Sequence, residues 1–123
     1  MLSTGGTSSE ADRRDTSTTV PALVARALGR CSMQYEAASR ALASSQPCGE
    51  EDYRRLAQIA EREARWFRVL HRWVYSAHST VPLVFGQAAV RAESSALDEA
   101  RHWTDGAEQR HTHDARREQE DQR

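Results

Sequence analysis

EREARWFRVLHRWVYSAH, residues 61–78, is the stretch that decides the fold, because around a helix it separates aromatic side chains from arginines. Placed at about 100° per residue, the apolar side chains between Leu56 and Ala77 cover roughly half of the circumference. The opposite side carries Arg54, Arg65, Arg68 and Arg72. Contact with one neighbouring helix needs only a narrower apolar stripe, so we expect this helix to be central and to touch two others.

Turn-forming stretches on both sides of this segment divide the chain into three predicted helices. TTVPA offers a capping threonine and an early proline, SSQPCG ends the first helix, and HSTVP separates the second from the third. A C-terminal stop of the third helix is expected at Gly106. The predicted helices span residues 21–44, 50–78 and 82–104.

The two ends of the chain are predicted to lie outside this bundle. Residues 1–18 hold few apolar side chains among many serines and threonines, which predicts a disordered tail. Residues 105–123 offer only Ala107 and Ala115 as apolar groups, which predicts a charged tail or a frayed helix. The expected fold class is therefore all-α: an antiparallel bundle of three long helices in residues 19–104.

The composition shows no overall charge preference for one class of partner. The 17 basic and 18 acidic residues of the 123-residue chain leave a net charge of -1, so no overall field favours nucleic acid or an anionic bilayer. Every basic residue is arginine, which indicates the codon bias of a GC-rich bacterial genome.

Two cysteines without metal-ligand spacing predict a reduced, cytoplasmic protein. The uncharged run from Trp73 to Val90 is broken by polar residues, proline and glycine, and favours a corner between helices over a membrane segment.

Two tryptophans extend the apolar surface of the second helix beyond what one contact needs. Trp66 and Trp73 lie seven residues apart at one margin of the apolar arc. Large amphipathic rings in this position are typical of oligomer interfaces. We therefore expect these two residues to close a homodimer, which would make the bundle larger.

Glutamates interrupt the apolar faces of the second and third helices. Glu63 lies among apolar neighbours, where a carboxylate needs a partner or a proton. Counting back from the turn in an antiparallel hairpin puts Glu63 level with Glu99, and His71 level with Glu93. Salt bridges to arginine or histidine from another helix are the favoured interpretation.

A metal site is the alternative interpretation of these glutamates. Glu99 and His102 form a Glu-x-x-His unit, which resembles the unit found in ferritin-like di-iron proteins. The resemblance implies an iron or manganese site of Glu63, Glu99 and His102 that is completed when two copies pair. The same spacing recurs at Glu108 and His111 in a polar segment, which shows that the unit arises easily by chance.

The remaining candidate surface is basic. The arginines of the second helix, which could follow a phosphate backbone or meet a protein partner, are Arg54, Arg62, Arg65, Arg68 and Arg72. A solvated face in which Glu61 pairs with Arg65 is the simpler interpretation.

The function is predicted by elimination. No nucleophile motif and no glycine-rich phosphate loop occurs, so no enzyme class and no cofactor is predicted. The predicted function is a small protein-interaction module of accessory, adaptor or regulatory type, acting through its helix faces as a homo-oligomer. The carboxylate-bridged metal protein and a nucleic-acid binder are the alternatives.

Overall fold

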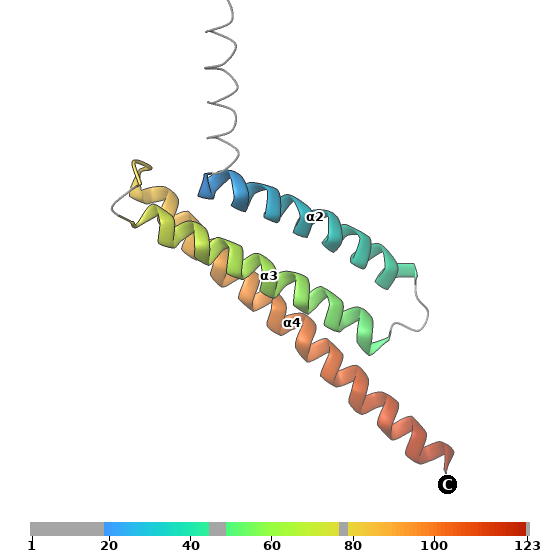
Figure 1. Cartoon of the computed structure of the whole chain (residues 1–123). Helices are drawn as coiled ribbons and strands as arrows, with labels where there is room; N and C mark the ends of the chain where they lie inside the picture. Colours follow the sequence, from blue (N-terminus) through green and yellow to red (C-terminus); the bar gives the residue numbers. More distant parts are fainter. Residues whose placement is uncertain (1–18, 45–48, 77–78, 123) are drawn as a thin grey trace, which may run out of the picture.

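The computed structural model describes residues 19–44, 49–76 and 79–122. These residues form three α-helices, and no strand occurs among them. The helices are α2 (Val20–Ser44), α3 (Glu50–Val74) and α4 (Leu83–Asp121). Both outer helices pack along α3, as predicted for the central helix, and α4 runs on past the start of α3 (Figure 1). The predicted all-α class is confirmed.

Helices α3 and α4 form an antiparallel pair with a close contact. Tyr75, just after α3, lies against Gly86 near the start of α4, whereas Tyr53 in the first turn of α3 lies against Gly106. Alanines supply most of the buried side chains of both helices, including Ala60 of α3. Small side chains let the two backbones approach closely, so much of the buried core of this pair comes from alanine methyl groups.

The packing of α2 on α3 supplies the larger apolar core. Cys31 and Ala38 of α2 are buried against Leu56 and Ile59 of α3. The partly buried side chains that cover this cluster are Tyr35, Leu42, Trp66 and Trp103. Leu56 has 0% of its surface exposed, so the core is best formed near the start of α3.

The observed start of α3 follows from its sequence. The carboxylate of Asp52 accepts a hydrogen bond from the backbone N–H of Gly49 at 3.1 Å. Three acidic residues, Glu50 to Asp52, stand in the first turn, where they favourably face the positive end of the helix dipole. The boundary predicted at residue 50 is therefore correct.

Two predicted helix ends are wrong. The second helix ends at Val74 rather than at residue 78. Just after it, the backbone N–H and the hydroxyl of Ser76 both donate to the carbonyl of Trp73, at 3.0 and 2.6 Å, which forms a tight turn. The third helix continues through Gly106 to Asp121. A Cβ at Gly106 would lie 3.1 Å from Cδ1 of Tyr53, so this glycine provides room for a ring instead of ending the helix. The predicted tail at residues 1–18 lies outside the described residues.

The C-terminal part of α4 projects beyond the other helices. His111 Nδ1 lies 3.1 Å from the carboxylate of Glu50, which marks the level at which α3 begins. Residues 112–121 extend about 15 Å further at about 1.5 Å per residue (Figure 1). This projection is mostly exposed and charged, with ion pairs such as Arg110 with Asp114 at 3.5 Å along the helix.

Candidate functional site

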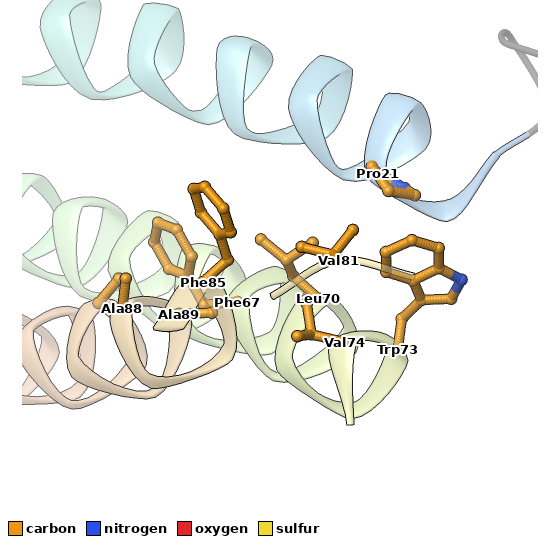
Figure 2. Close-up of a pocket in the computed structure, with 10 residues that line it drawn as sticks. Pro21, Phe67, Leu70, Trp73, Val74, Val81, Phe85, Ala88 and Ala89 are labelled. Atoms are coloured by element: carbon orange, nitrogen blue, oxygen red, sulfur yellow. The ribbon is translucent and has the colours of Figure 1, made fainter. Parts of the chain in front are cut away.

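An apolar cleft opens where the start of α2, the end of α3 and the start of α4 meet. We call it the hairpin-end cleft; it has a volume of about 410 Å³. Its lining residues are Pro21, Phe67, Leu70, Trp73, Val74, Val81, Phe85, Ala88, Ala89 and Ala92. Figure 2 shows Phe67 and Phe85 standing side by side on α3 and α4, with Pro21 of α2 across the space from them. None of the lining side chains carries a charge.

The outer helices α2 and α4 touch each other through side chains that lie away from the cleft. Away from the cleft, the ring of Tyr35 packs edge-on against Trp103 with centroids 6.5 Å apart. The hydroxyl of Tyr35 also donates to Glu99 Oε1 at 2.6 Å. At the hairpin end, α2 contributes only Pro21 to the lining, and α4 contributes alanines beside Phe85. Small side chains on both outer helices leave the space unfilled.

Exposed apolar side chains occur on two of the helices that form the cleft. Leu83 and Val84 are each 62% exposed in the first turn of α4, Phe85 is 58% exposed, and Leu23 of α2 is 46% exposed. A concentration of exposed apolar surface is typical of a site that another molecule covers. Across the part of the chain that the structure describes, no helix has the length and apolarity needed to cross a membrane.

An acid pocket lies further along the same side of α3. It has a volume of about 220 Å³ and is lined by Ser32, Tyr35, Glu36, Glu63 and Glu99. The structure thus brings Glu63 and Glu99 together, as the hairpin register predicted. Glu36 on the rim pairs with Arg40 at 3.7 Å, but within residues 19–44, 49–76 and 79–122 neither Glu63 nor Glu99 forms an ion pair.

Burial and like charge control the electrostatics of the acid pocket. Partial burial raises the pKa of Glu63, and the charge of Glu99 raises it further. Burial also raises the pKa of Tyr35, whose hydrogen bond to Glu99 adds to the shift. The pKa of the Cys31 thiol is raised by burial and by the charge of Glu63. All three shifts disfavour further negative charge, so the pocket is short of a cation.

The predicted metal ligands are only partly assembled. His102 is exposed, and its ring packs against Trp103 with centroids 4.9 Å apart. Among the described residues, no group of three or more His, Cys, Asp or Glu side chains could hold a metal ion. Glu63 and Glu99 alone come together, and completion of an iron or manganese site by a second copy stays a prediction.

Glu93 is the buried charge that joins α3 to α4. Its side chain is 12% exposed, Arg68 Nε donates to it at 2.9 Å, and His71 Nε2 lies 2.6 Å from its other oxygen. Burial by itself would raise the pKa of Glu93, but the hydrogen bonds and charges of Arg68 and His71 outweigh it and lower the pKa. The predicted register of His71 with Glu93 is confirmed, and the salt-bridge interpretation holds for this glutamate.

The predicted arginine face is largely engaged within the chain. Arg54 bonds Glu50, Arg62 donates to Gln34 at 2.9 Å, and Arg68 bonds Glu93. Arg65 and Arg72 are exposed and have no hydrogen bond or ion pair within the described segments. Glu61 therefore does not form the predicted pair with Arg65. Two uncommitted arginines make a weak track for a phosphate backbone.

The predicted interface tryptophans are both half-buried within one chain. Trp66 packs against the core between α2 and α3, and Trp73 lines the hairpin-end cleft. A homodimer closed by these residues stays a prediction. Sequence reasoning missed the cleft itself, although the uncharged run from Trp73 to Val90 and the alanines that follow Phe85 were its signal.

Comparisons with known proteins supply no relative. No protein-family model, no curated protein sequence and no solved structure matches this chain.

Proposed function

We propose that this chain is a helical protein-interaction module and that the hairpin-end cleft binds its partner. The observation that carries the proposal is the cleft: an open space between α2 and α4 with an apolar lining that includes the exposed ring of Phe85. When an apolar side chain of a partner enters the cleft, it is removed from water, and no polar group of the lining is buried without a hydrogen bond.

A helix is the form of partner that suits the cleft. Sites for small molecules combine apolar walls with a few polar groups that orient the ligand, and charged groups are lacking in this lining. A groove between two helices that runs along a third accepts an amphipathic helix through residues spaced three and four apart. Accessory, adaptor and regulatory proteins commonly act through such contacts.

The proposal is tested by adding a charge to the cleft. Ala88 is exposed and lines the cleft, so Ala88→Arg changes the lining without disturbing the buried core. Gln87→Arg is the matched control, because Gln87 is exposed and does not line the cleft. A displayed library of helical peptides of about 15 residues with one apolar face provides the probe.

We expect peptides selected on the wild-type chain to bind Ala88→Arg at least about tenfold more weakly and Gln87→Arg unchanged. Equal binding by both variants, or a library from which no peptide is selected, would contradict the proposal. A second copy is the competing occupant. A dimeric mass in sedimentation equilibrium that becomes monomeric in Ala88→Arg would assign the cleft to homo-oligomerisation instead.

A further inference from the structure

We propose that the partner of the hairpin-end cleft is an amphipathic helix carrying an arginine or lysine that pairs with Glu63 and Glu99. This inference rests on the proposed function and specifies the chemistry of the partner. The basic side chain stands one to two turns beyond the apolar residues that fill the cleft.

The cleft and the acid pocket lie between the same three helices. Both are bordered by α2 and α4 and have side chains of α3 in their lining. Glu63 precedes Phe67 by one helical turn, about 6 Å, and Leu70 by two turns, about 10 Å. A helix lying over Phe67 and Leu70 in the direction of α3 therefore passes directly over Glu63.

Among the residues that the structure describes, no basic side chain forms an ion pair with either of these two carboxylates. Arg62 turns away to Gln34, and Arg68 and His71 are bound to Glu93. Burial raises the pKa values of Cys31 and Tyr35, which keeps both groups neutral, and Glu36 pairs with Arg40. Arg30 and Arg62 act on Cys31 through their charge, but neither forms an ion pair with Glu63 or Glu99 in the described ranges. The groove consequently holds two uncompensated negative charges beside an apolar surface.

A cation from the partner would find unused hydrogen-bond acceptors on Glu63 and Glu99. Glu99 accepts from Tyr35 through Oε1, and its Oε2 has no hydrogen bond within the described ranges. Glu63 has no hydrogen bond there at all, although its side chain is half-buried. A guanidinium or ammonium group bonded to both carboxylates replaces their mutual repulsion by attraction, which is stronger in a partly desolvated site. Charge complementarity thus selects a basic helix over an acidic or neutral one.

The experiment uses the full chain and a library that varies one position. Helical peptides keep a fixed apolar face, and the varied position is seven residues from the anchor that lies over Leu70, on the side toward Glu63; it is Arg, Lys, Gln, Ala or Glu. Binding is measured by fluorescence anisotropy for the wild type and for the Glu63→Gln, Glu99→Gln double variant. Glu61→Gln is the matched control, because Glu61 is an exposed glutamate on the opposite side of α3.

We expect the arginine peptide to bind wild type about tenfold more tightly than the glutamine peptide. The preference should fall to about twofold or less in the double variant and stay intact in Glu61→Gln. Binding of all peptides with equal affinity overturns the inference and leaves the proposed function standing. If no peptide binds, or if the chain is dimeric with the cleft occupied by its second copy, both this inference and the proposed function are wrong.

Discussion

At the level of single residues, two glutamates on the inner faces of α3 and α4 have opposite electrostatic surroundings. Glu93 is bonded to Arg68 and His71, so its charged form is stabilised. Glu63 faces Glu99 without a cation, so its charged form is destabilised. The sequence predicted that both would lie inside, but only the three-dimensional arrangement shows which of them the chain compensates.

Substituting these glutamates should change stability in opposite directions. At pH 7, Glu63→Gln is expected to raise the free energy of unfolding by up to about 1 kcal/mol, a small gain because the side chain is half-exposed. Glu93→Gln is expected to lower it by about 1–2 kcal/mol, because Arg68 and His71 lose a charged acceptor. Urea unfolding followed by circular dichroism measures both, with Glu61→Gln as an unchanged control.

The pH dependence of the two variants follows from the directions of the pKa shifts. The folded pKa of Glu63 lies above the ordinary value of 4.5, so its penalty is present at neutral pH and fades as pH falls through the raised pKa. The folded pKa of Glu93 lies below 4.5, so its contribution is complete above 4.5 and is lost as pH falls through the lowered pKa. A destabilising Glu63→Gln substitution at pH 7 would mean that this carboxylate has a partner.

At the level of the helices, two glycines differ in the space around them. Gly29 of α2 has no atom within 4 Å of an added Cβ, whereas a Cβ at Gly106 meets the Tyr53 ring at 3.1 Å. Gly29→Ala should therefore stabilise the fold by about 0.5–1 kcal/mol, and Gly106→Ala should gain less or be destabilising. Thermal unfolding of both variants checks this, and equal gains would show that the ring of Tyr53 moves freely aside.

The helix ends show what sequence reasoning can supply at this scale. The start of α3 was predictable because Gly49 and three following acids act locally, within one turn. The role of Gly106 was not, because it depends on a tyrosine that lies 53 residues earlier in the sequence and reaches it only through the antiparallel pairing. A glycine followed by polar residues looks the same whether it ends a helix or accommodates a ring.

At the level of the whole molecule, α4 is longer than the bundle it belongs to. Deleting residues 112–123 should reduce the helical signal but shift the unfolding midpoint by no more than about 2 °C, because the last buried apolar residue of α4 is Ala107. Circular dichroism of the shortened chain measures both quantities. A large fall in the midpoint would show that the projection packs against something, such as a second copy.

The candidate site was the least predictable part of the molecule. Periodicity placed Phe67, Leu70 and Trp73 inside the bundle, and they do face inward, but it could not show that α2 fails to cover them fully. That depends on which side chains of α2 face the hairpin end, where Pro21 is the one residue of α2 in the cleft lining. A pattern of apolar residues shows which side of a helix faces the core. It does not show how fully the neighbouring helices cover that side.

The way α2 meets α4 has a mechanical consequence. Both helices pack along α3, but they touch each other through side chains, among them Tyr35 of α2 with Glu99 and Trp103 of α4. Side chains change rotamer at a far lower cost than packed helix backbones move. The space between the two outer helices can thus adjust to bulky or slender groups while all three helices stay in place.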